Sequence, residues 1–244
     1  MKKENGFTLI EILVALFIGS VMLTAVFGAV NMAQKSSSGV ERKVLAQQDA
    51  RNTLEIMAME IGMASYNPTL TSANIWDLNC AGAGTGTQTY RGIQAANANS
   101  ITVEMDITNP AGTATDGDGI ISGPNEIITY NYAGNIYITR ETNCGGAQPI
   151  LGAAAAAADQ QSKNVLVVNN VAGPGNSAIP VFRYYDGAGL EIPSPVTARI
   201  PEIRRIEIIV VVDAQYVNPM NGQRARVVYS TSVIPRNHMN LYTY

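Results

Sequence analysis

One acidic residue, Glu11, lies inside an almost continuous apolar stretch near the start of the chain. Residues 7–32 read FTLIEILVALFIGSVMLTAVFGAVNM, and Glu11 is their only charged side chain. A carboxylate in such a stretch costs about 2.5–3.5 kcal/mol on membrane-insertion scales, so it needs a partner or has a function. The alternative is an acid that is tolerated close to the membrane surface.

Proteolysis would create the cation that Glu11 lacks. The lysines nearest to it, Lys2 and Lys3, both precede Gly6. Cleavage of the Gly6–Phe7 bond would turn the α-amino group of Phe7 into a cation about one helical turn before Glu11. Such a cation would give the Glu11 carboxylate a partner of opposite charge.

The apolar stretch is long enough to cross a membrane. As a helix it would span roughly 39 Å, and the hydrocarbon core of a bilayer needs about 20 residues. A secretory signal peptide has a shorter apolar region followed by an Ala-x-Ala-like cleavage site, and no such site clearly follows here. The two lysines before the stretch favour a cytoplasmic N-terminus and export of the remaining chain.

The run GFTLIE at residues 6–11, followed by a long apolar segment, resembles the signal of type IV pilins and type II secretion pseudopilins. In that family a membrane prepilin peptidase cuts after the glycine and N-methylates the new first residue. The resemblance implies that Gly6 is the last leader residue and Phe7 the methylated N-terminus. Glu11 matches the family's acid at the fifth mature position, which is thought to pair with the N-terminal amine of a neighbouring subunit. Such pairing would neutralise a charge in an apolar filament core.

A second resemblance narrows the type of subunit. Residues 49–54 and 60–68, the late segment 204–206 and the ending 229–237 are similar to PilW-like minor pilins and J-type minor pseudopilins. The resemblance implies a subunit at or near a filament tip that helps to initiate assembly. Its implied partners are other pilins, prepilin peptidase and the inner-membrane assembly platform. A pilus, a type II secretion system and a tip-exposed adhesin remain open as alternatives.

These two resemblances predict an α+β, type IV pilin-like fold in four parts. The expected parts are a leader at residues 1–6, a transmembrane helix at 7–32, an amphipathic helix at 33–68 that ends at Pro68, and a globular head at 69–244. The implied location is the inner membrane as a single pass, with a periplasmic head, and then the filament. Gly28 and Gly39 are candidate kinks.

Periodicity supports the amphipathic helix and an antiparallel sheet. Apolar residues near 3–4 spacing predict that the helix resumes after the membrane; they are Val40, Val44, Leu54, Met57 and Ile61. Alternating and β-branched runs predict strands at 101–107, 181–185, 203–212 and 227–233, and a hairpin at 128–139 that turns at Gly134-Asn135.

The two cysteines, Cys80 and Cys144, form an even pair in a chain that is expected to enter an oxidising compartment. A disulfide between them would stabilise the fold by about 4 kcal/mol on the chain-entropy view. Two free thiols are the alternative.

Asp116 and Asp118 belong to the run DGDGI, which resembles the start of a calcium-binding loop. Ile120 stands where that loop has its next ligand, so the full signature fails. A plain turn before a strand explains the same residues. Calcium is the only cofactor that the sequence suggests.

The overall composition excludes several classes of function. Charged residues make up 14% of the chain and the net charge is −3, which gives no electrostatic footprint for nucleic acid. With one histidine, His238, and no cluster of candidate catalytic residues, we expect a structural protein rather than an enzyme, and a surface position for His238. The alanine run at 153–158 receives no function.

Overall fold

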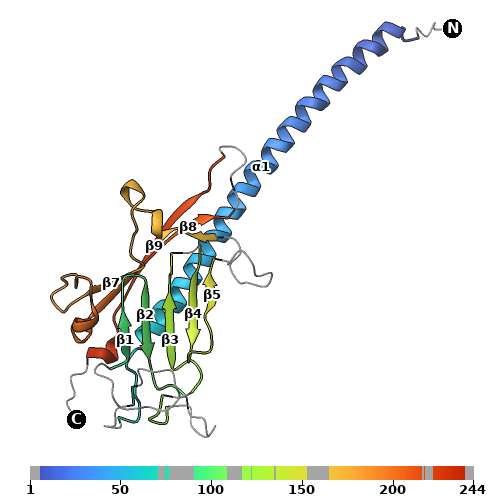
Figure 1. Cartoon of the computed structure of the whole chain (residues 1–244). Coiled ribbons are helices and arrows are strands. Elements are labelled where there is room, and N and C mark those ends of the chain that lie inside the picture. Colours follow the sequence, from blue (N-terminus) through green and yellow to red (C-terminus); the bar gives the residue numbers. More distant parts are fainter. Residues whose placement is uncertain are drawn as a thin grey trace.

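A single helix, α1 (Leu9–Gly62), runs from the N-terminal end of the molecule into the head (Figure 1). This computed structural model describes residues 6–70, 75–76, 91–108, 117–121, 123–134, 136–152, 165–215, 217 and 222–239. The first half of α1 projects away from the head, and the second half lies against the strands. The helix continues through Gly28 and Gly39, the two candidate kinks.

The helix ends at Gly62, earlier than the predicted boundary at Pro68. Ser65 adopts a positive φ of 67°, and its N–H donates to the carbonyl oxygen of Glu104 at 2.9 Å. The chain therefore leaves the helix because it bonds to a strand distant in sequence, a contact that local sequence does not reveal.

The second half of α1 buries one face. The buried positions recur every three or four residues, as expected for a helix packed on a core; they are Ala46, Ala50, Thr53, Leu54, Met57, Glu60 and Ile61. Leu54, Met57 and Ile61 are buried as predicted. Val40 and Val44 are 61% and 43% exposed, because they precede the part of α1 that touches the head.

The first sheet is antiparallel with its strands in chain order. It contains β1 (Ile93–Ala96), β2 (Ser100–Glu104), β3 (Ile127–Asn131), β4 (Ile138–Thr142) and β5 (Gln148–Leu151). The predicted hairpin is confirmed as β3 and β4, in which Tyr130 lies opposite Arg140. The sequence did not predict β1, which is short and carries a register irregularity, or β5, which contains Pro149.

The second sheet is built around β8, its longest strand. It contains β6 (Val165–Val167), β7 (Phe182–Tyr185), β8 (Arg205–Ala214) and β9 (Arg226–Val233). β9 pairs with β8 along residues 206–213, whereas β6 and β7 pair with opposite ends of β8. The predicted strands at 181–185, 203–212 and 227–233 are therefore confirmed.

The sheets and α1 share one hydrophobic core. Ile206, Ile208, Val210 and Val212 of β8 are all fully buried, as their shared face predicted. Among the described residues the head also has four short 3-10 segments: η1 (Asn169–Val171), η2 (Pro174–Asn176), η3 (Thr197–Glu202) and η4 (Arg236–Met239). A long N-terminal helix packed on antiparallel sheets is the predicted α+β fold.

Candidate assembly site

The predicted cleavage point lies just outside the helix. Gly6 and Phe7 precede α1 and belong to no helix or strand. Thr8 is the N-cap residue of α1, with an extended backbone at φ −78° and ψ 151°. The Gly6–Phe7 bond therefore lies in a non-helical stretch, two residues before α1 begins at Leu9.

Thr8 and Glu11 form a capping box at the start of α1. The Glu11 Oε2 atom accepts a hydrogen bond from the Thr8 backbone N–H at 2.8 Å and another from the Thr8 hydroxyl at 2.9 Å. In return, the Glu11 N–H donates to Thr8 Oγ1 at 3.4 Å. The carboxylate thus has partners within its own chain, and its place in the first turn suits the positive end of the helix dipole. The sequence-based interpretation missed this bonding, although the spacing Thr-x-x-Glu is its known signature.

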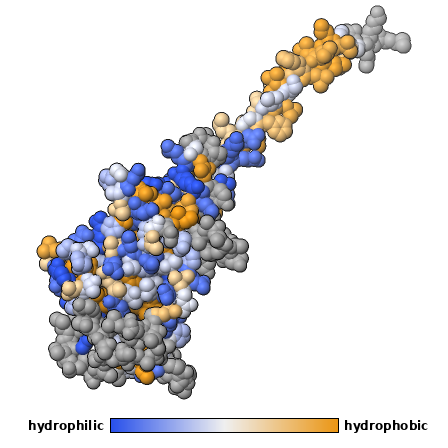
Figure 2. All heavy atoms as spheres, in the orientation of Figure 1, coloured by the Kyte–Doolittle hydropathy of each residue, from blue (hydrophilic) through white to orange (hydrophobic). Residues whose placement is uncertain are grey.

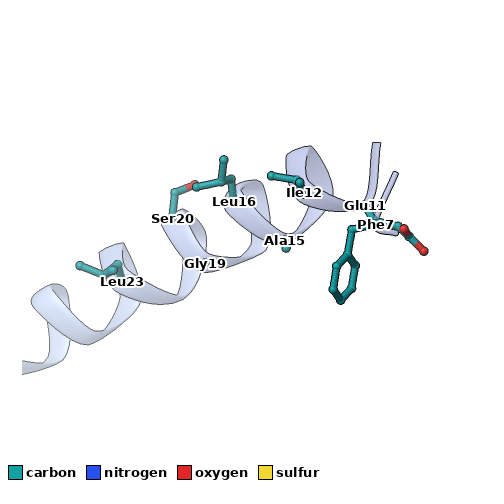
Figure 3. A pocket seen from close by; sticks show the side chains of 8 residues that line it. All are labelled: Phe7, Glu11, Ile12, Ala15, Leu16, Gly19, Ser20 and Leu23. Carbon is teal, nitrogen blue, oxygen red and sulfur yellow. The ribbon is translucent and has the colours of Figure 1, made fainter. Parts of the chain in front are cut away.

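Glu11 heads a row of residues on one face of α1, in which Ala15 and Gly19 are small. Ala15, Gly19 and Leu23 follow it at intervals of four residues, and Phe7 lies beside the same end of the helix (Figure 3). Ile12, Leu16 and Ser20 line the neighbouring row. Small residues four apart allow close approach of a second helix in a membrane, so this shallow groove can accommodate one.

The first half of α1 exposes its apolar side chains on all sides. Among the large apolar residues of this segment, the exposed fraction of the residue ranges from 47% at Val30 to 86% at Phe7. Figure 2 shows orange, hydrophobic side chains dominating the outer part of this projecting segment, with pale bands between them and blue side chains nearer the head. By length and composition, α1 can cross a membrane. Such a surface needs lipid or other apolar helices around it.

The structure describes one of the two predicted calcium residues, Asp118. Asp116 lies outside the described residues. The Asp118 carboxylate accepts the N–H of Ile120 at 3.0 Å, which is the bonding of a simple turn. The backbone N–H groups of Asp118 and Gly119 donate to the carboxylate of Asp106, at 3.0 and 2.8 Å. Calcium binding by Asp116 and Asp118 stays a prediction.

Two buried carboxylates, Asp106 and Glu126, organise the segment between β2 and β3. Both are fully buried. Glu126 Oε1 accepts the N–H groups of Ile107 and Thr108 at 3.1 and 2.9 Å. Burial raises the pKa of Asp106, which the N–H groups of Gly119 and Asp118 partly offset. The sequence-based interpretation assigned neither residue this role, because the sequence does not show which donors will surround a buried acid. Within the described part of the chain, no group of three or more His, Cys, Asp or Glu side chains could hold a metal ion.

Cys144 follows β4 and is disulfide-bonded. Cys80 lies outside the described residues, so the pairing of the two cysteines stays a prediction.

His238, the expected surface histidine, is partly exposed and partly buried. Its ring contacts Ser65, Arg91 and Ile200, three residues that are distant from it in sequence.

Comparison with known proteins identifies the N-terminal segment. Residues 1–27 match the family model of the prokaryotic N-terminal methylation motif. No curated protein and no solved structure is significantly similar to the chain. The matched residues include Gly6, Phe7, Thr8 and Glu11, which are the residues of the site described above. The chain therefore begins with the methylation signal of type IV pilin-like proteins, a structural rather than an enzymatic class, and this signal implies contact with an assembly machinery.

Proposed function

We propose that this chain is a PilW-like minor type IV pilin, a structural subunit that prepilin peptidase processes and that helps to initiate assembly at or near the filament tip. The observation that carries the proposal is the methylation motif at residues 1–27, placed on an apolar helix that projects from a separate head. The weaker likeness of segments after the apolar stretch to PilW-like proteins supports the minor role.

Processing would occur between Gly6 and Phe7, with N-methylation of Phe7. A peptidase needs an extended backbone at the bond it cuts, and the Gly6–Phe7 bond precedes the helix that starts at Leu9. The capping box of Thr8 and Glu11 supports this boundary because it stabilises the first turn immediately after the bond.

Assembly would depend on the Glu11 carboxylate. In the single chain Glu11 is bonded to Thr8. In a filament, the α-amino group of a neighbouring subunit would pair with Glu11, while the groove of Ala15 and Gly19 receives a neighbouring helix. Other pilins would then cover the apolar surface of α1, and the assembly platform in the inner membrane would extract the subunit from the bilayer.

The orientation and location follow from the same proposal. Lys2 and Lys3 would keep the N-terminus in the cytoplasm, so the head would be periplasmic before assembly and external afterwards. A J-type minor pseudopilin of a type II secretion system shares the same signal and is the second candidate. A tip-exposed binding subunit is compatible with the same architecture, and we assign it no ligand.

Co-expression of the full chain with a prepilin peptidase tests the processing step. We expect intact mass spectrometry to show loss of residues 1–6 and gain of one methyl group on Phe7. Gly6→Val should abolish the cut, whereas the matched control Gly28→Ala should be processed normally, because a Cβ at Gly28 meets nothing within 4 Å. A wild-type chain that keeps residues 1–6 beside an active peptidase would refute the proposal.

Deletion and labelling experiments test the minor role. A strain that lacks the chain should make few filaments or secrete poorly, and complementation should restore them. A label on the head should then appear at filament ends. A label distributed along the whole filament would instead indicate a major subunit, and unchanged assembly in the deletion strain would contradict a role in initiation.

A further inference from the structure

β9 leaves one edge of the second sheet open along its whole length. Where the structure describes the chain, β9 pairs with β8 alone. The N–H of Ala214 donates to the carbonyl oxygen of Ala225 at 2.9 Å, in the same register as the β8–β9 pairs. Because hydrogen-bonded pairs alternate along an antiparallel ladder, every second residue of β9 directs its N–H and C=O groups away from β8. These open-edge residues are Arg226, Val228, Ser230 and Ser232.

The open edge is exposed to solvent. Its four residues are exposed, with Val228 at 59%, whereas the residues between them are half-buried and Val233 is buried. Among the described residues, none forms a hydrogen bond to the backbone N–H or C=O groups of the four. A row of such groups is a template for another extended strand.

The other edges of the two sheets are short, interrupted or covered. β1 and β5 have four residues each; β1 carries a register irregularity and β5 contains Pro149. β6 has three residues, and the outer side of β7 is bonded to Ala98 and Ile192. Proteins use such features to prevent pairing between sheet edges. In contrast, β9 has eight residues without proline, lysine or a register shift, and its single charged residue, Arg226, pairs with Asp213.

Arginines at the two ends of β9 give the open edge an excess of positive charge. They are Arg224 and Arg226 at its start, and Arg205 and Arg236 at its end. The two acids of β8, Asp213 and Glu207, already accept hydrogen bonds from Arg226 and from the Tyr185 hydroxyl. Charge complementarity therefore favours a partner strand with acidic residues at its ends.

A second copy of this chain fits the open edge poorly. β9 and α1 are in contact and run in the same direction, and Val233 lies beside Gly62, the last residue of α1 (Figure 1). Antiparallel pairing of two β9 strands would point the two α1 helices in opposite directions, so both could not insert from the same side of one membrane. Parallel pairing in register would place Arg226 of one copy beside Arg226 of the other, which is unfavourable for like charges.

We propose that the open edge of β9 is a docking site for an extended, acidic segment of another protein, which adds a strand to the second sheet. The backbone of that segment would satisfy the open-edge N–H and C=O groups, and its acidic residues would face the arginines at the two ends of β9. The inference rests on the strand pairing of the head and does not depend on the proposed function.

The first experiment tests whether the edge is open. The full chain, labelled with ¹⁵N and kept in detergent micelles, gives amide hydrogen-exchange rates by NMR. After correction for intrinsic rates, we expect the amides of Val228, Ser230 and Ser232 to exchange at least about tenfold faster than those of Tyr229 and Thr231. Equal protection of the two sets would overturn the proposal.

The second experiment uses a synthetic peptide as the partner. The probe is the end-blocked peptide Glu-Thr-Val-Thr-Val-Thr-Val-Glu, and the matched probe has lysine in place of both glutamates. At millimolar peptide and low salt, we expect the glutamate probe to slow exchange at Val228, Ser230 and Ser232 and to bind at least about fivefold more tightly than the lysine probe. The difference should shrink in about 0.5 M salt, because salt screens exposed charges. No slowing of exchange, or equal binding of the two probes, would overturn the acidic partner.

The third experiment removes the backbone pairing and keeps the charges. N-methylation of two adjacent central residues of the glutamate probe removes an N–H from each of its edges, so it should abolish the slowing. Ser230→Pro removes an N–H that faces away from β8 and should weaken binding at least about tenfold, whereas Ser230→Ala should bind like the wild-type chain.

Protection of the Thr231 amide reports whether β9 stays paired with β8 in the proline variant. If β9 stays paired and the variant still binds the glutamate probe normally, the open edge is not the site. If β9 does not stay paired, the N-methylated probe decides, and its binding to the wild-type chain at undiminished strength would overturn the proposal.

Discussion

Arg140 on β4 donates two hydrogen bonds to the carboxylate of Glu60 on α1, from Nε at 3.0 Å and from Nη2 at 2.7 Å. Tyr130 on β3 donates its hydroxyl to the same carboxylate. Burial raises the pKa of the Tyr130 hydroxyl, and the neighbouring Glu60 raises it further, so this hydroxyl remains a donor. The helix that projects from the head is thus joined to the first sheet through one buried acid.

Replacement of Glu60 by Ala should destabilise the protein strongly. It would leave Arg140 and the Tyr130 hydroxyl without their acceptor in a mostly buried place, which costs about 3–5 kcal/mol for a broken buried ion pair. Urea unfolding of the full chain in detergent gives the free energy of unfolding. The matched control is Glu202→Ala, which breaks the exposed pair with Arg199 and should cost under about 1 kcal/mol. Equal effects of the two variants would contradict a structural role for the buried pair.

Substitution of Gly117 by Ala should disturb the segment between β2 and β3. A Cβ at this position would overlap the carboxylate of Asp106, to which Asp118 and Gly119 donate. We expect a loss of roughly 1–3 kcal/mol in the free energy of unfolding, as for overpacking of a core. Gly187→Ala is the control, because its Cβ would meet only Arg204 Cγ at an ordinary 3.7 Å. If Gly117→Ala and Gly187→Ala change the free energy of unfolding equally, Asp106 does not stabilise this segment as described.

Thr8→Val should weaken the start of α1, whereas Thr8→Ser should preserve it. Valine removes the hydroxyl that bonds Glu11, and loss of an N-cap costs about 0.5–2 kcal/mol. Hydrogen exchange of residues 9–12 in detergent micelles should rise in the valine variant alone. An increase in the serine variant as well would show that the hydroxyl is not the cause.

The Glu11→Gln variant should be processed normally but should assemble poorly. The amide still accepts a hydrogen bond from Thr8 but cannot neutralise an α-amino group. We therefore expect normal cleavage and membrane insertion, with assembly reduced at least tenfold when filaments or secreted protein are counted. Glu41→Gln, on an exposed part of the same helix, is the control and should assemble normally. Normal assembly of the Glu11→Gln variant would show that assembly does not depend on the negative charge of Glu11.

If the DGDG run is only a turn, addition of calcium should release no heat and should leave Tm unchanged. Asp118 already bonds the N–H of Ile120, and the neighbouring N–H groups face the Asp106 carboxylate rather than a cation. Isothermal titration and thermal unfolding of the full chain with millimolar calcium measure this. Heat release and a rise in Tm that Asp118→Asn abolishes would instead establish the calcium site.

The residues of the assembly site could be recognised because they are contiguous. The cleavage point, the cap and the carboxylate all lie within residues 6–11, and a run of apolar residues defines the helix behind them. Their relation is set by the geometry of one helical turn, which does not depend on the rest of the chain. The strands with strong alternation, such as β8 and β9, could be predicted for the same local reason.

The internal bonding of the head depends on contacts between distant residues. Glu60 meets partners 70 and 80 residues away, and His238 meets Arg91 across 147 residues. Periodicity identifies which face of an element is apolar, but it does not say which buried acid will meet which donor, because that depends on strand order and register. The start of the chain is thus fixed by local chemistry, whereas the end of α1, the buried acids and the place of His238 are decided by packing of the two sheets around the helix.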